Sequence, residues 1–164
     1  MNLIAAVDNK WGIGYKNKLL ISIPDDMKFF KEMTTGKVCI MGRSTLNSLP
    51  GGRPLSGRVN IVLTKDKSFK KDGVIVANSV EQALEAIKEY DTKDVFVIGG
   101  ESIYSQFMPY VDTAFITYTD YSYQSDKYLE NLDKSADWKM IVESEEQTYF
   151  DVEYYYRRYE RMAN

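Results

Sequence analysis

Short apolar runs bounded by polar, glycine or proline residues recur through the first two thirds of the chain. They lie at residues 3–7, 38–41, 59–63, 74–77 and 95–98, with the sequences LIAAV, VCIM, VNIVL, VIVA and VFVI. These runs lack the alternation of apolar and polar residues that marks a half-exposed strand. Continuous apolar strands of this length are typical of a parallel sheet that is covered on both faces. The pattern therefore predicts buried parallel strands.

Helical patterns separate these apolar runs. The clearest lies at residues 79–90, where Ser79 and Gln82 have the spacing of a capping box. The apolar side chains that share one face of this helix are Val80, Ala83, Leu84 and Ile87. A second pattern follows Gly99 and Gly100. Its apolar side is formed by Ile103, Tyr104, Phe107 and Val111. Strands that alternate with amphipathic helices predict an α/β fold.

The last third of the chain has a different pattern. Residues 114–119, 138–146 and 152–160 are apolar or aromatic runs that follow one another without a helical pattern between them. This arrangement is typical of antiparallel strands. We therefore expect a three-layer α/β fold with a mostly parallel central sheet and antiparallel C-terminal strands. A chain of 164 residues, 44% of them hydrophobic, fits a single domain over residues 1–164.

The charge balance argues against broad classes of partner. Lys and Arg number 21 against 24 Asp and Glu, the net charge is −3, and no basic run stands out. We therefore expect no nucleic-acid partner and no membrane partner. No apolar stretch approaches the roughly 20 residues that cross a bilayer, and the N-terminus lacks the pattern of a secretion signal. We expect a cytoplasmic protein and, because nothing in the sequence indicates an obligate interface, a monomer.

The chain contains no histidine and a single cysteine, Cys39, which lies inside an apolar run. No Ser-His-Asp or Cys-His arrangement is therefore available, the commonest zinc ligand is missing, and we expect no metal site. One cysteine cannot form an internal disulfide, and its apolar neighbours predict a buried thiol. Any acid–base chemistry falls to Asp, Glu, Lys, Tyr or water.

The stretch IPDDMKFF, residues 23–30, places two carboxylates at the start of a predicted helix. Ser22 and Asp25 have the spacing of a capping box, and Pro24 suits a first helical turn. This pattern gives Asp25 a structural role. Asp26 instead shares a helical stripe with the apolar residues Phe29, Phe30 and Met33.

Two interpretations of Asp26 are open at this point. The free N–H groups and the dipole of the first helical turn could satisfy its carboxylate, and a shift of the cap by one residue would exchange the roles of Asp25 and Asp26. Alternatively, an acid beside apolar side chains is costly unless a cation or a hydrogen-bond donor meets it. That partner can be a bound ligand.

Two turns that lead from a strand into a helix carry glycine: residues 42–45, GRST, and residues 99–102, GGES. Such a turn can hold a phosphate with its backbone N–H groups, although either turn alone is a common connection. Together, at the carboxyl ends of two parallel strands, they favour a ligand site, and Thr64 and Lys65 follow a strand that ends at the same edge. The segment WGIGYKN, residues 11–17, has Asn17 where a dinucleotide fingerprint needs its third glycine, so we interpret it as a flexible loop.

The segment GRPLSGR, residues 52–58, carries two arginines. Its proline and glycine content is typical of an exposed loop. Arg58, at the entrance to a predicted strand, has the alternative of binding a carboxylate through its planar fork.

Several segments, taken in order, resemble the dihydrofolate reductase family. They cover nearly the whole chain: LIAAVD at 3–8, GIG with a later N-x-L at 12–19, IPDDMKFFK at 23–31, VCIMGRST at 38–45, GGRPLSGRVNIVLT at 51–64, VFVIGGESIYSQFMP at 95–109 and ITYTD at 116–120. The resemblance implies an NADPH-dependent oxidoreductase that reduces 7,8-dihydrofolate to 5,6,7,8-tetrahydrofolate. In this reaction hydride goes to C6 and a proton is added at N5. The resemblance also implies a place in one-carbon metabolism and binding of antifolate inhibitors.

Within this resemblance, Asp26 matches the family's active-site carboxylate, which binds N3 and the 2-amino group of the pterin. Thr117 matches the threonine that supports this carboxylate, and the N5 proton is expected to arrive through water. Arg58 matches the arginine that binds the α-carboxylate of the substrate's tail, with Arg53 nearby at the rim. The positions that enclose the substrate and the nicotinamide are Ile4, Ala6, Met27, Phe30, Leu49, Ile98 and Tyr104.

The resemblance also assigns a cofactor site. The turns that match those holding the pyrophosphate of NADPH consist of Gly42, Arg43, Ser44 and Thr45, and of Gly99, Gly100, Glu101 and Ser102. Arg43, Thr64 and Lys65 are expected near the adenosine 2′-phosphate, which favours NADPH over NADH. The residues that match a mobile lid over the nicotinamide are Ile13, Gly14, Asn17, Lys18 and Leu19. The remaining expected cofactor contacts are Ala6, Leu63, Ile103 and Tyr104.

Two features depart from the family's pattern. Where the family usually has Pro and Trp before the helix, this chain has Leu20 and Ile21, so an aliphatic side chain replaces an indole that binds water. Glu101 places an acid near the expected pyrophosphate, and we expect its carboxylate to point away. Two rival functions are open: a reductase of the same fold that acts on a riboflavin-precursor pyrimidine, and a binding module without catalysis.

Overall fold

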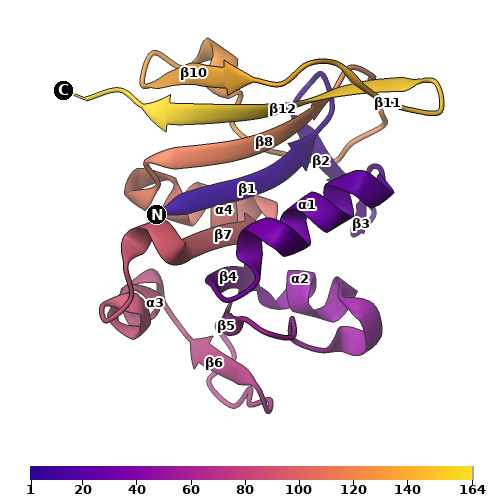
Figure 1. The fold of residues 1–164 in the computed structure, drawn as a ribbon. Coiled ribbons are helices and arrows are strands. Elements are labelled where there is room, and N and C mark those ends of the chain that lie inside the picture. The colour runs from indigo at the N-terminus through magenta and orange to yellow at the C-terminus, as the bar shows by residue number, and fades with distance from the viewer. Residues whose placement is uncertain (164) are drawn as a thin grey trace.

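The computed structural model describes residues 1–163. One nine-stranded sheet runs through the molecule in the order β10-β12-β8-β1-β7-β4-β5-β6, and β11 pairs with β12 outside this path (Figure 1). Its parallel strands are β1 (Asn2–Val7), β4 (Val38–Gly42), β5 (Val59–Leu63), β6 (Val74–Ala77), β7 (Val95–Gly99) and β8 (Thr113–Thr119). The antiparallel strands are β10 (Trp138–Glu143), β11 (Gln147–Tyr149) and β12 (Val152–Arg161). The predicted α/β class with a mostly parallel sheet is confirmed.

The bounds of the predicted strands lie within one or two residues of the observed ones with one exception, and one further strand differs from the prediction in direction. The run at 138–146 ends as a strand at Glu143. The run at 114–119, which we expected among the antiparallel strands, pairs in parallel with β1 as well as antiparallel with β12. The direction of β8 depends on a neighbour that lies more than a hundred residues earlier, so its own residues do not encode that direction. β8 thus joins the parallel half of the sheet to the antiparallel half.

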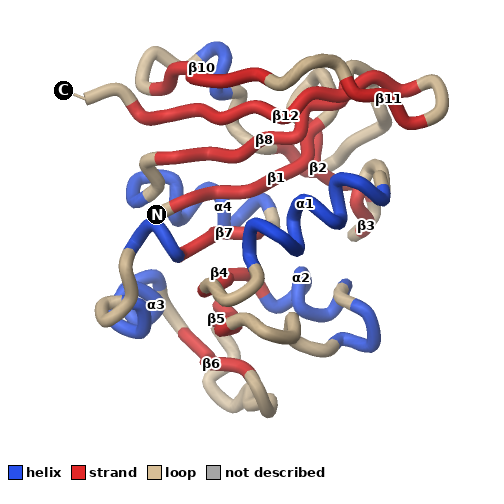
Figure 2. The backbone as a smooth tube through the Cα atoms, in the orientation of Figure 1, coloured by secondary structure: helices blue, strands red, loops and turns tan. Residues whose placement is uncertain are grey.

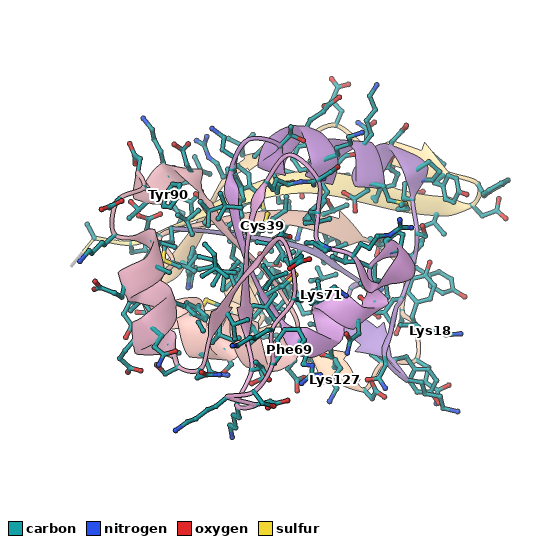
Figure 3. All side chains as sticks on the ribbon, turned by 90° about the horizontal axis from the view of Figure 1, so that it is seen from below. Lys18, Cys39, Phe69, Lys71, Tyr90 and Lys127 are labelled. Carbon is teal, nitrogen blue, oxygen red and sulfur yellow. The ribbon has the colours of Figure 1, made fainter. Side chains whose placement is uncertain are left out.

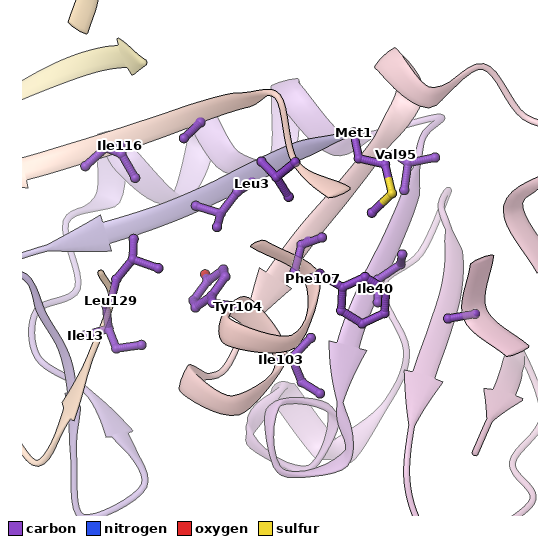
Figure 4. Close-up of a cluster of buried hydrophobic side chains, with 14 of the residues drawn as sticks. Met1, Leu3, Ile13, Ile40, Val95, Ile103, Tyr104, Phe107, Ile116 and Leu129 are labelled. Carbon is purple, nitrogen blue, oxygen red and sulfur yellow. The ribbon is translucent and has the colours of Figure 1, made fainter. Parts of the chain in front are cut away.

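Helices cover both faces of the sheet (Figures 1 and 2). They are α1 (Pro24–Thr34), α2 (Arg43–Ser48), α3 (Val80–Ile87) and α4 (Glu101–Phe107), and the short 3-10 helices are η1 (Pro50–Gly52), η2 (Thr92–Asp94), η3 (Met108–Tyr110) and η4 (Leu132–Lys134). The larger hydrophobic cluster packs α3 and α4 against one face (Figure 4). A smaller cluster packs Leu46 of α2 against Cys39 and Met41 on the other face. Because Val38 and Ile40 belong to the larger cluster, β4 is buried on both sides, as its continuous apolar run predicts.

A second, three-stranded sheet contains the segment that we interpreted as a flexible loop. It consists of β2 (Gly12–Tyr15), β3 (Lys18–Leu19) and β9 (Lys127–Tyr128), in the order β3-β2-β9. β2 and β3 form a hairpin whose two turn residues, Lys16 and Asn17, have φ angles of 49° and 64°. Two adjacent left-handed residues are typical of a type I′ hairpin turn. The loop prediction was wrong because the glycines of β2 carry no apolar pattern and because β9 lies far away in sequence.

The predicted helix caps are partly wrong. Ile23, not Ser22, is the N-cap of α1, and within the described chain no side chain caps this helix. The Ser22 hydroxyl instead donates to the sulfur of Met27 at 3.1 Å. The Ile23 side chain is buried in the core, which fixes the start of the helix one residue later than the capping-box pattern indicates. In α3, the Ser79 hydroxyl accepts from the Gln82 backbone N–H as predicted, and the helix ends at Ile87.

None of the helices in residues 1–163 combines the length and apolar character needed to span a membrane.

Candidate active site

Asp26 lies in the first turn of α1 and its carboxylate is held by β8. The Thr117 hydroxyl donates to Oδ1 of Asp26 at 2.6 Å. Thr117 is buried and Asp26 is half-buried, whereas Asp25 is exposed. Burial raises the pKa of Asp26, and the hydrogen bond from Thr117 lowers it in part. In the part of the chain that the structure describes, no lysine or arginine forms a salt bridge with Asp26, so the acid has one donor and spare acceptor capacity.

The sheet next to this acid is incompletely covered. Ala6 of β1 lies opposite Thr117 in the strand register. Ala6 and Ile98 of β7 are only partly buried, although both strands are in the middle of the sheet. Met27, which follows Asp26, leaves 61% of its surface exposed. Exposed apolar surface beside a half-buried acid is what a flat, partly polar ligand would cover.

Tyr104 of α4 supports β1 from the opposite face of the sheet. Its hydroxyl donates to the carbonyl oxygen of Ile4 at 2.8 Å, and burial raises the pKa of the phenol well above its usual value. Figure 4 shows the Tyr104 ring between α4 and β1. The ring also packs against the end of β7, where a Cβ on Gly99 would lie 3.2 Å from it and where Gly99 has a φ of 117°. Only glycine suits this conformation without strain.

The two glycine turns predicted to hold a phosphate lie side by side. β4 pairs with β7 so that Met41 is opposite Gly99. A Cβ on Gly42 would lie 3.0 Å from the side chain of Ile103, and one on Gly100 would lie 3.8 Å from the Thr45 hydroxyl. In residues 1–163, neither α2 nor α4 has a side-chain cap, so their first-turn N–H groups are left for other acceptors.

Arg43 has a partner that the sequence analysis did not identify. Its Nη1 lies 3.1 Å from Oδ2 of Asp66, and its guanidinium lies 4.2 Å from the centre of the Phe69 ring. Figure 3 shows Phe69 in the loop between β5 and β6. The Thr64 hydroxyl accepts from the Asp66 backbone N–H at 3.2 Å, and Lys65 is exposed. Arg43, Thr64 and Lys65 therefore lie at the same edge of the sheet, together with an acid, Asp66.

Arg58 lies at the far end of α1 from Asp26. Its Nη1 donates to the Thr34 hydroxyl at 3.0 Å and its Nε donates to the Ser56 carbonyl at 2.9 Å. Eight residues of helix at 1.5 Å each separate Asp26 from Thr34 by about 12 Å. A ligand that reached from the acid to this arginine would therefore be elongated. Arg53 is exposed and Leu49 is partly buried against the smaller hydrophobic cluster.

The β2–β3 hairpin is tied to the loop around β9. The Lys16 backbone N–H donates to Oδ2 of Asp126 at 3.0 Å, and the Asp126 N–H donates to the Gly14 carbonyl at 3.0 Å. Ile13 and Gly14 are buried, whereas the residues that remain exposed are Asn17, Lys18 and Leu19.

Glu101 turns toward this small sheet. Its Oε2 accepts from the Tyr128 backbone N–H of β9 at 2.7 Å. The carboxylate thus joins the first turn of α4 to β9 and does not merely face the helix dipole. Its partner lies 27 residues later in the chain, so no local sequence signal reveals it.

Comparisons with known proteins agree over almost the whole chain. Residues 1–161 match the family model described as dihydrofolate reductase. The chain is 34% identical over 169 residues to the dihydrofolate reductase of Staphylococcus haemolyticus, and this match covers 99% of this chain and 96% of the relative. It is 38% identical over 141 residues to that of Buchnera aphidicola subsp. Schizaphis graminum, covering 86% and 85%. The solved structure of a dihydrofolate reductase from Enterococcus faecalis, complexed with NADP(H) and RAB-propyl, superposes with a TM-score of 0.87 at 30% identity and covers 99% of this chain and 96% of that one.

Proposed function

Because this chain belongs to the dihydrofolate reductase family, we propose that its site reduces 7,8-dihydrofolate to 5,6,7,8-tetrahydrofolate with NADPH, adding a proton at N5. The observation that carries this proposal is the half-buried carboxylate of Asp26, held by Thr117 and without a cationic partner in the described residues. Such an acid needs a bound donor to offset its burial. A pterin, with adjacent N–H groups at N3 and the 2-amino position, supplies that donor.

The substrate spans from Asp26 to Arg58 in this proposal. Asp26 accepts hydrogen bonds from the pterin, and Thr117 fixes which carboxylate oxygen is free to do so. Ala6, Ile98 and Phe30 provide apolar surface for the rings. Arg58, about 12 Å further along α1, binds the tail carboxylate, and its contact with Thr34 holds the guanidinium in place. The ionised acid stabilises the positive charge that develops on the pterin as N5 is protonated through water.

NADPH, when bound, supplies the hydride. The residues present fit it: the two adjacent glycine turns offer uncapped backbone N–H groups to a pyrophosphate. Arg43, Thr64 and Lys65 lie at the end of β4 and β5, where they can meet a 2′-phosphate. Tyr104 fixes the position of β1 through its hydrogen bond to the Ile4 carbonyl oxygen. The β2–β3 hairpin excludes water from the transfer when it lies over the site.

The decisive experiment mixes purified protein with dihydrofolate and NADPH and follows the loss of NADPH absorbance. Consumption that depends on dihydrofolate supports the proposal. Consumption only with the riboflavin-precursor pyrimidine would identify the rival reductase, and binding of both ligands without oxidation would identify a silent binding module. Asp26→Asn serves as the control for turnover at this site. A single domain over residues 1–164, a monomer and a cytoplasmic location stay predictions.

A further inference from the structure

Asp66 forms a salt bridge with Arg43, the residue whose guanidinium is proposed to bind the 2′-phosphate of the cofactor. Its Oδ2 lies 3.1 Å from Nη1 of Arg43. Its other oxygen, Oδ1, accepts from the Ser68 backbone N–H at 2.9 Å and from the Ser68 hydroxyl at 2.6 Å. The guanidinium also lies over the Phe69 ring, with Cζ of Arg43 4.2 Å from the ring centre. Arg43 is thus held in place before any phosphate arrives.

We propose that Asp66 is a specificity-determining residue, which competes with the 2′-phosphate of NADPH for Arg43 and thereby limits the preference for NADPH over NADH. This inference rests on the proposed function. The residues proposed so far for the 2′-phosphate site attract the phosphate, whereas Asp66 opposes its binding.

The pair can exchange partners. Both side chains are more than two fifths exposed, at 41% for Arg43 and 44% for Asp66. Exposed pairs of this kind contribute little, and a phosphate dianion makes stronger charge-assisted contacts with a guanidinium than a carboxylate does. NADPH can therefore take Arg43 from Asp66, whereas NADH leaves the pair intact. The cost of this exchange falls on NADPH alone.

Asp66 is anchored by its own loop. Its two hydrogen bonds from Ser68 keep the carboxylate beside Arg43, and the contacts with Ser68 and Arg43 lower the pKa of Asp66. The acid is therefore charged at neutral pH. Lys65 and Lys67, the neighbouring cations of the loop, are exposed and have no salt bridge within the described chain. They offset only part of the like-charge contact between Asp66 and the phosphate.

The test compares Asp66→Asn with Ser68→Ala. The asparagine keeps an oxygen that can accept from Ser68, so the loop is retained while the charge is removed. We expect it to raise the ratio of kcat/KM for NADPH over NADH by up to about five-fold, which is the upper end of the factors that surface ion pairs contribute. Ser68→Ala removes the hydroxyl contact but keeps the charge of Asp66 and its contact with the Ser68 backbone N–H, so its ratio should stay within two-fold of the unaltered protein. An unchanged ratio in Asp66→Asn would overturn the inference.

Competition for Arg43 is tested by repeating the change in Arg43→Ala. Without the guanidinium there is nothing to compete for, so the gain from Asp66→Asn should fall to less than half. A gain of full size in that background would show direct repulsion and overturn the competition.

A binding measurement separates this inference from the proposed reaction. Calorimetry with 2′,5′-ADP and with adenosine 5′-monophosphate needs no turnover, and Asp66→Asn should tighten only the former. If the unaltered protein failed to oxidise NADPH with dihydrofolate but this tightening occurred, the proposed reaction would be wrong and the role of Asp66 would stand. If the protein oxidised NADPH with dihydrofolate but Asp66→Asn did not selectively tighten binding of 2′,5′-ADP, the proposed reaction would stand and the role of Asp66 would be wrong.

Discussion

Asp26→Asn gives the most direct test of the site. The amide keeps the size of the acid and an oxygen that can accept from Thr117, which now lies 2.6 Å away. It removes the charge that the protonated pterin requires. A hydrogen bond to a charged group contributes about 1.5–3 kcal/mol, and the loss of one preorganised electrostatic contact costs about 100- to 1,000-fold in rate. We expect kcat/KM at neutral pH to fall by about that factor, measured from NADPH absorbance at limiting dihydrofolate.

The pH dependence follows from the direction of the pKa shift. Burial raises the pKa of Asp26 in the folded chain above the ordinary value of 3.8. At pH values between 3.8 and this raised pKa, the folded chain therefore binds more protons than the unfolded chain. The free energy of unfolding contributed by this group therefore falls as pH rises through that window. Asp26→Asn removes this cost, so the variant should unfold at a higher temperature at neutral pH, and the difference should vanish below pH 3.8. Its rate deficit should also shrink in acid, because the medium then protonates the substrate.

Asp25→Asn is the matched control. It makes the same chemical change one residue earlier, on the exposed side of α1. Its kcat/KM should stay within about two-fold of the unaltered protein, because surface charges are strongly screened. Equal losses in the two variants, or an Asp26→Asn variant with unaltered turnover from pH 6 to 9, would refute the role given to Asp26.

Two further changes probe the contacts around the site. Thr117→Val removes the donor to Asp26 and should lower kcat/KM about ten-fold while moving the acid limb of the pH–rate profile to higher pH, because the hydrogen bond lowers the pKa of Asp26; an unmoved profile would contradict this. Glu101→Ala removes the acceptor for the Tyr128 N–H, so hydrogen exchange at that amide should speed up by at least ten-fold in the ligand-free protein, whereas Glu101→Gln, which keeps an acceptor oxygen, should retain most of the protection. Equal exchange in both variants would show that the contact does not fix β9.

The large sheet could be predicted because strands that are buried on both faces are rich in apolar residues along their own sequence. The runs at 38–41 and 95–98 are continuously apolar, the run at 59–63 is apolar except for Asn60, and each is a parallel strand. The strands of the small sheet have no such apolar pattern. β2 contains two glycines and one isoleucine, and its neighbour β9 follows more than a hundred residues later. Its existence depends on the left-handed turn at Lys16 and Asn17 and on contacts between distant segments.

The same division applies to the site. The acid in an apolar helical stripe drew attention to Asp26 but left two interpretations open, and the family resemblance then assigned it to the site. The cap of α1 was not predictable, because the burial of Ile23 against the core overrides the capping spacing of Ser22. Asp66 was missed because its partner Arg43 lies 23 residues earlier in the chain. An acid in a polar loop has no local feature that distinguishes a solvated side chain from one that holds an arginine.

The position of β12 affects the order in which the site can be assembled. This ten-residue strand, Val152–Arg161, lies between β8 and β10, and Tyr156 sits opposite Thr117. During synthesis the ribosome releases β8 long before β12 emerges, so Thr117 belongs to an unpaired sheet edge until translation has passed residue 161. Until β12 pairs with β8, the residue that holds Asp26 therefore lies on an open sheet edge, which is the kind of edge that other chains can pair with.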